Sequence, residues 1–229
     1  MGPVLVGLLI LAGWSVAGGQ SPGAEEAVTA VQAEKLLPLR ERTRPFRVID
    51  GEQLDERLPL ALRPTRGGEP GEWVLEFSDL NTLYLAVAAD NAVEIVRLDL
   101  PEEDLAVVYE PPVRLLPAEL RPQGQQEERS EVRVYGLESG EHEHTGEVRH
   151  KLHPPSRSRF RTDRGSMAGY LVRIEQQIDL PMTQVRLDLA AGYVSEFGMV
   201  YRRVDYTRET AGLFGETLRR AAVLAEEAE

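Results

Sequence analysis

All four histidines of this chain lie within one stretch of twelve residues. Neutral imidazole and carboxylate groups are the ligands that zinc and copper take where thiolates are absent, and the chain has no cysteine. If residues 145–146 form a two-residue turn, the flanking strands bring three ligands to one face of a hairpin. These candidate metal ligands are His142, His144 and Glu147. Arg149 would then stand opposite His142 and repel a cation, so an exposed polar hairpin without a metal is the alternative interpretation.

A basic segment, residues 149–164, overlaps the end of this stretch. Its six cations are opposed only by Asp163, which gives the segment a charge of +5 and leaves −17 on the rest of the chain. The cations are Arg149, Lys151, Arg157, Arg159, Arg161 and Arg164. Alternate residues of a strand share one face at a spacing of about 7 Å, and planar guanidinium groups in a row suit carboxylates, sulfates or phosphates. Arg157, Arg159 and Arg161 are therefore the candidate site for an anionic ligand, unless they pair with the protein's own surplus carboxylates.

Catalytic signatures are mostly missing from the sequence. It has no thiol nucleophile and no glycine-rich phosphate loop. We therefore expect a non-catalytic protein that binds a protein partner or an anionic ligand, such as an anionic glycan, without a cofactor. One alternative is a metal-binding accessory protein for zinc or copper, and another is a carbohydrate-related hydrolase or sugar-binding module, because a sequence does not give the distance between two carboxylates. The net charge of −12 argues against a nucleic-acid partner.

The elements that would position these residues are mainly strands. From Trp73 onward, apolar residues recur at every second position in segments that turn residues separate. One polar and one apolar face indicate antiparallel sheets wetted on one side, and the sequence lacks the strand and helix alternation of a parallel α/β fold. We predict a mainly β fold, an antiparallel β-sandwich of one or two related β units. The pentapeptide Val-Arg-Leu-Asp-Leu at 96–100 and at 185–189 favours a duplication, although alternating strands also converge on such strings.

Helical segments are predicted at both ends of the strand-rich region. A short helix or linker precedes the strands, and an amphipathic helix capped by Thr207 follows them. The apolar stripe of the second helix is Leu213, Phe214, Leu218, Ala221, Ala222 and Ala225. The expected segments are a signal peptide (1–19), a linker or short helix (20–44), a first β-rich unit (45–120), a connector (121–130), a second β-rich unit (131–206) and the C-terminal helix (207–229).

The N-terminus predicts export. Residues 3–17 form an uncharged apolar run that is too short to span a bilayer comfortably, and small and polar residues follow it. Cleavage after Ala17 or Gly19 would release a periplasmic or secreted protein with no stable membrane insertion. Because no lysine or arginine precedes Lys35, an uncleaved N-terminal membrane anchor is the alternative. The sequence leaves the oligomeric state open.

Overall fold

The computed structural model describes residues 31–51, 54–65, 71–77, 81–121, 124–195, 197–210 and 214–226. The predicted signal peptide (1–19) lies outside these residues. The described chain is almost entirely strand, with one short helix, α1 (Ala33–Leu36), and one 3-10 turn, η1 (Pro101–Glu103). Neither helical element has the length and apolar character needed to cross a membrane.

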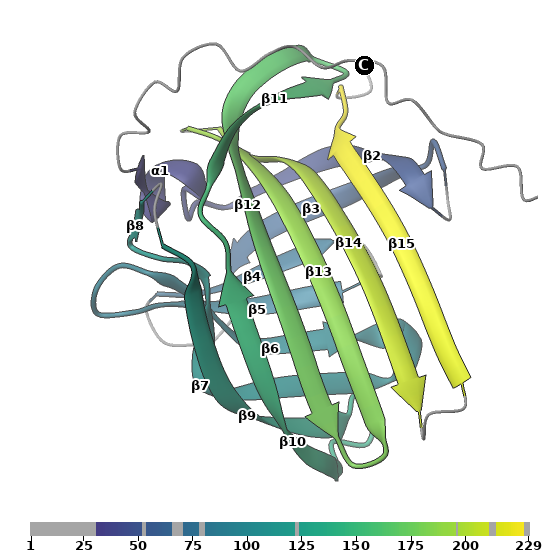
Figure 1. Ribbon diagram of the computed structural model, residues 1–229. Helices are drawn as coiled ribbons and strands as arrows, with labels where there is room; N and C mark the ends of the chain where they lie inside the picture. Colours follow the sequence, from purple (N-terminus) through teal and green to yellow (C-terminus); the bar gives the residue numbers. More distant parts are fainter. Residues whose placement is uncertain are drawn as a thin grey trace, which may run out of the picture.

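Antiparallel strands follow one another along the described chain, and most pair with the strand before and the strand after, as a meander (Figure 1). Strands β1 to β8 are β1 (Val31–Gln32), β2 (Arg42–Gly51), β3 (Arg57–Pro64), β4 (Glu72–Phe77), β5 (Asn81–Val87), β6 (Val93–Leu100), β7 (Leu105–Leu116) and β8 (Glu119–Leu120). Strands β9 to β15 are β9 (Gln126–Gly136), β10 (His142–Leu152), β11 (Ser156–Thr162), β12 (Gly165–Leu180), β13 (Thr183–Val194), β14 (Gly198–Thr210) and β15 (Phe214–Leu224).

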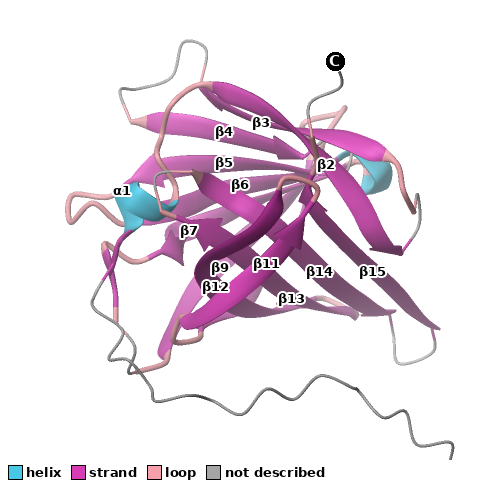
Figure 2. Cartoon of the chain, turned by 90° about the horizontal axis from the view of Figure 1, so that it is seen from above, coloured by secondary structure: helices cyan, strands magenta, loops and turns pink. Residues whose placement is uncertain are grey.

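Two pairings between distant strands close this sheet into a barrel. β15 pairs with β2, and the second half of β12 pairs with β10. β11 pairs only with the first half of β12 and stays outside the ring, while β1 and β8 form a separate pair. The walls formed by β12–β15 and by β3–β6 face each other across the interior, as Figures 1 and 2 show from two directions.

The predicted β-sandwich is wrong, although the alternation behind it belongs to real strands. A sandwich sheet and a barrel wall are both wetted on one side, so a period of two does not distinguish them. The difference lies in the pairing of β15 with β2, two strands from opposite ends of the described chain. β9 also begins inside the predicted connector 121–130 and joins β7 to β10, so both expected β-rich units share one sheet and one core. The duplication stays a prediction.

The predicted C-terminal helix is also wrong, because residues 214–224 form strand β15. The apolar residues of this segment fit two periods at once: Leu218, Ala222 and Leu224 are also in phase with a strand. β15 gains a full ladder with β14 and a second, shorter ladder with β2. These tertiary pairings override the helix propensity of an alanine-rich segment. At the other end of the described chain, α1 is a helix of four residues.

One end of the barrel is filled by side chains. Leu36 of α1, Phe46 of β2, Tyr193 of β13 and Leu224 of β15 are fully buried in one core cluster. α1 lies at the upper end of the barrel in Figure 1 and contacts β14. The rest of the interior is not filled to the same degree, and this is where the cavity described below is located.

The ring has a seam on one side of β15. Its ladder with β14 runs from Phe214 to Val223, whereas its ladder with β2 covers only residues 220–224. Within the described residues, the edge of β15 that faces away from β14 has no ladder partner over residues 214–219. Above this seam, Arg202 of β14 reaches across the interior to Asn81 at the start of β5.

Candidate functional site

The two facing walls enclose an apolar cavity of about 110 Å³. Its apolar lining comes from both walls and includes Leu83, Ile95, Leu98, Leu100, Ile174, Leu187, Leu189, Val204 and Leu218. A second cavity of about 280 Å³ shares Leu98, Leu100 and Leu187 with it, so the two are neighbours in one interior. The leucines of both Val-Arg-Leu-Asp-Leu copies therefore line the same space. An apolar cavity with a few polar groups is the usual form of a small-molecule site.

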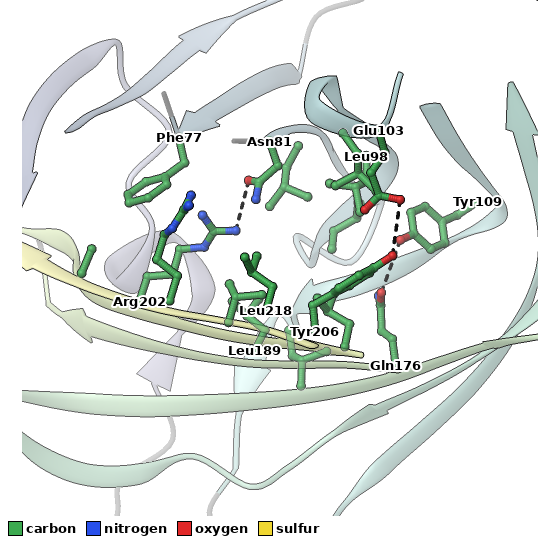
Figure 3. A pocket seen from close by; sticks show the side chains of 18 residues that line it. Phe77, Asn81, Leu98, Glu103, Tyr109, Gln176, Leu189, Arg202, Tyr206 and Leu218 are labelled. Atoms are coloured by element: carbon green, nitrogen blue, oxygen red, sulfur yellow. Dashed lines mark hydrogen bonds between the residues drawn. The ribbon is translucent and has the colours of Figure 1, made fainter. Parts of the chain in front are cut away.

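Arg202 carries a positive charge into this apolar lining (Figure 3). Its Nη2 donates a hydrogen bond to Oδ1 of Asn81 at 3.0 Å, and its guanidinium carbon lies 4.8 Å from the centre of the Phe77 ring. Both partners are neutral, and no ion pair joins Arg202 to a carboxylate among the described residues. Asn81 and Phe77 thus orient the guanidinium group without neutralising its charge.

Partial burial changes the electrostatics of Arg202. Desolvation, assisted by the positive charge of Arg220, lowers the pKa of Arg202 to about 10. The group therefore remains protonated at neutral pH. Arg220 reaches the same cavity from β15, where it lies opposite Val204 and is only 6% exposed. Two guanidinium groups thus occupy one interior wall.

A second arginine of the interior, Arg208, forms an ion pair with a carboxylate. Nη1 of Arg208 lies 3.2 Å from Oε2 of Glu103, and the hydroxyl of Tyr206 donates to the same oxygen at 3.4 Å. These contacts join η1 to β14 across the seam, at the boundary that both cavities share. Arg208 and Glu103 therefore neutralise each other. Arg202 differs, because no described side chain balances its charge.

An uncharged hydrogen-bond chain joins β7, β12 and β10 inside the barrel. The hydroxyl of Tyr109 donates to Oε1 of Gln176 at 3.3 Å, and Nε2 of Gln176 donates to Nδ1 of His150 at 3.0 Å. Burial raises the pKa of Tyr109 and lowers the pKa of His150, so both side chains are neutral near pH 7. This chain adds polarity to the cavity wall without adding charge.

The three candidate metal ligands do not share a face. Residues 145–146 lie inside the continuous strand β10, and the turn before it falls at residues 137–140. A register shift between His142 and His144 places His142 against the outward Tyr135 and His144 opposite the buried Val134. Glu147 lies on the outer surface, 3.4 Å from Arg129. The predicted hairpin geometry is therefore wrong, and no cluster of metal-ligating residues occurs in the described part of the chain.

The three candidate anion-binding arginines lie on strand β11. Arg157, Arg159 and Arg161 are exposed, whereas Phe160 between them is only 8% exposed. The Phe160 ring stacks on Tyr201 with ring centres 5.9 Å apart, and it occupies the space where Gly192 has no side chain. These arginines lie on the outer surface and take no part in the cavity lining.

The sequence analysis missed the cavity residues, above all Arg202 and Arg220. A signal for both exists in the alternation of their strands. Arg202 is in phase with Val204 and Tyr206, and Arg220 is in phase with Leu218 and Ala222. A charged residue at an apolar position of a strand is the pattern that would have pointed to the interior.

The fold and the cavity together define a closed antiparallel barrel with a mainly apolar interior that carries cationic groups. No protein-family model matches the sequence, and no curated protein matches it either. Two solved structures are similar in outline. One is a candidate lipoprotein from Parabacteroides distasonis, 12% identical, with a TM-score of 0.39 over 82% of this chain and 95% of that chain. The other is a candidate exported protein with a YmcC-like fold from Bacteroides fragilis, 13% identical, with a TM-score of 0.38 over 82% of this chain and 96% of that chain.

At this identity and TM-score, the two matches carry no argument about the function or the location of this chain. Export therefore continues to rest on the apolar run of residues 3–17.

Proposed function

We propose that this protein is exported and binds an amphiphilic small molecule, with the apolar chain in the barrel interior and an anionic head group on Arg202. The observation that carries the proposal is the guanidinium group of Arg202, which enters an apolar cavity with only neutral described partners. The proposal keeps the expectation of a non-catalytic protein for an anionic ligand. It moves the contact from the outer surface to the interior.

Arg202 is partly buried, so part of its hydration is lost on folding. A buried ion that lacks a counterion loses hydration, and proteins normally pair such ions or bind a ligand of opposite charge. Asn81 accepts one of the five N–H groups that a guanidinium offers, which leaves donors for a carboxylate or a phosphate. Arg220 places a second guanidinium group in the same wall. The leucines around both groups favour an aliphatic chain on the same molecule.

The test compares two neighbouring arginines on β14. Arg202→Gln removes the interior charge, whereas Arg203→Gln removes the charge of an outward residue that pairs with Asp205 at 2.6 Å. Binding of a fluorescent fatty acid is measured by titration, and unlabelled fatty acid, monoalkyl phosphate and fatty alcohol of equal chain length serve as competitors. The acid and the phosphate distinguish the two head-group chemistries, and the alcohol removes the charge.

We expect Arg202→Gln to weaken fatty acid binding by about 10- to 100-fold, the equivalent of one lost charge-assisted hydrogen-bond pair. Arg203→Gln should bind within about twofold of the unchanged protein, since surface pairs contribute little. The alcohol should compete poorly. Equal binding by both variants, or an alcohol that competes as well as the acid, would remove the proposed role of Arg202.

A further inference from the structure

Arg159 and Arg161 of β11 differ from many arginines of the barrel surface. Several arginines elsewhere on the outer wall pair with acids, as Arg63 does with Glu76 at 2.7 Å and Arg133 with Glu110 at 2.8 Å. For Arg159 and Arg161, the described part of the chain supplies no such ion pair. Their positive charges therefore face solvent on a protein that is otherwise strongly acidic.

The strand that pairs with β11 places no acid directly opposite its three exposed arginines. Arg157 lies opposite Tyr170, Arg159 opposite Ala168 and Arg161 opposite Ser166. Directly opposed residues are nearest neighbours on a sheet face, so this is where intramolecular acids would stand if the arginines were paired across the ladder. The neighbours are instead neutral, and two of the three are small.

β11 also has an open edge. It is the last strand in the sheet order and pairs with β12 alone. No backbone hydrogen bond outside that ladder involves residues 156–162 among those the structure describes. An edge of this kind presents unused N–H and C=O groups that another extended segment can bind. The three arginine side chains stand roughly perpendicular to the sheet, so they flank this edge without covering its backbone.

We propose that the open edge of β11 binds an extended acidic segment of a partner protein as an additional strand. In such a pairing the partner's alternate residues lie beside Arg157, Arg159 and Arg161 at the same period of two, so acidic residues at every second position face the three guanidinium groups. Backbone hydrogen bonds supply affinity and the charges select the partner. Two copies of β11 would place arginine beside arginine, which disfavours self-association through this edge.

The test uses the full-length protein and three synthetic peptides of equal composition. The first alternates glutamate with threonine, the second groups its glutamates in one block, and the third repeats the alternating sequence with N-methyl groups on the edge that would pair. Binding is measured by fluorescence anisotropy at low salt. A sulfated glycan and vesicles of anionic lipid are measured alongside, because they would also bind a row of arginines but need no strand edge.

Two charge variants separate this site from general electrostatics. Arg157→Gln, Arg159→Gln and Arg161→Gln together remove the row, and the matched control R63Q, R129Q and R133Q removes the same charge from arginines on other strands of the wall. Circular dichroism establishes that both variants are folded before binding is compared.

We expect the alternating peptide to bind and the row variant to weaken it by about tenfold or more, while the control stays within about threefold. The blocked and N-methylated peptides should bind much more weakly. Equal binding of the N-methylated peptide would overturn the strand-addition proposal. The proposal is also overturned if the row variant loses binding only to the glycan or the vesicles and not to the alternating peptide. Cavity binding of a fatty acid is a separate measurement, so neither result decides the other.

Discussion

The interior arginine and the arginines of β11 carry the same chemical group into opposite surroundings. Arg202 lies in an apolar cavity, where desolvation lowers its pKa to about 10 and where Asn81 and Phe77 fix its orientation. Arg159 and Arg161 lie on an exposed strand face beside neutral neighbours. The surroundings of a guanidinium group therefore determine what it can bind. In a low-dielectric cavity one charge is enough to select an anionic head group, whereas in water several weak charges must act together.

The two surroundings also differ in how a charge affects the stability of the folded protein. A partly buried charge without a counterion opposes folding, and the anionic ligand that we propose would offset this cost. An exposed arginine neither gains nor loses much on folding. Substitution of Arg202 should therefore change both stability and binding, whereas substitution of the exposed arginines should change binding alone.

The largest effect should come from removing the contact that holds β11 to the barrel. Phe160→Ala deletes a ring that packs over Gly192 and stacks on Tyr201, and we expect a loss of about 3–5 kcal/mol in the free energy of unfolding. Urea denaturation provides the measurement. Below the melting temperature the variant should lose acidic-peptide binding but keep fatty acid binding. Loss of both would mean that the two regions are not independent.

Replacing the interior charge should lower affinity without lowering stability. We expect Arg202→Met to weaken fatty acid binding at least as much as Arg202→Gln does, and to leave the unliganded protein as stable as before or more stable by about 1 kcal/mol, because a partly buried ion is exchanged for a side chain that suits an apolar cavity. Thermal melts with and without fatty acid check both parts. A marked fall in the midpoint of the unliganded variant would instead assign Arg202 a structural role.

Salt should weaken binding at the two sites to different degrees. Between about 50 mM and about 500 mM sodium chloride we expect peptide binding to β11 to weaken by about tenfold or more, because mobile ions screen exposed charges. Fatty acid binding to the cavity should change by less than about threefold over the same range, since the ion pair forms away from solvent. Equal salt dependence in the two titrations would contradict the placement of the head group in the interior.

A smaller effect concerns His150, which lies in the interior wall. Burial lowers its pKa, with the negative charge of Glu128 acting in the opposite direction. The unfolded chain therefore binds the proton first as the pH falls through about 6.5, so the folded state loses stability by at most about 1.4 kcal/mol per pH unit below that value. His150→Gln should flatten this dependence between pH 7.5 and 5.5 in urea titrations. A slope that the variant shares with the unchanged protein would trace the effect to other groups.

Local sequence patterns were informative about strands and their faces. The period of two indicates which side chains of Trp73–Phe77 and of Gly165–Val194 share a face, because alternation follows from the geometry of an extended chain. The same rule puts Arg157, Arg159 and Arg161 together. It failed at Phe214–Leu224, where alanine and leucine suit two periods, and at the histidines, where the register shift after His142 interrupts the alternation.

The sequence by itself determined that this protein is built from antiparallel strands with one apolar face, since that depends only on neighbours along the chain. The tertiary structure alone decided that the sheet closes, because the pairing of β15 with β2 joins residues far apart in sequence. Closure turned the apolar faces into an interior, and it placed Arg202 inside while leaving Arg203, the next residue, in solvent beside Asp205. The chemical roles of these two identical neighbouring residues follow from which side of a closed wall each one faces.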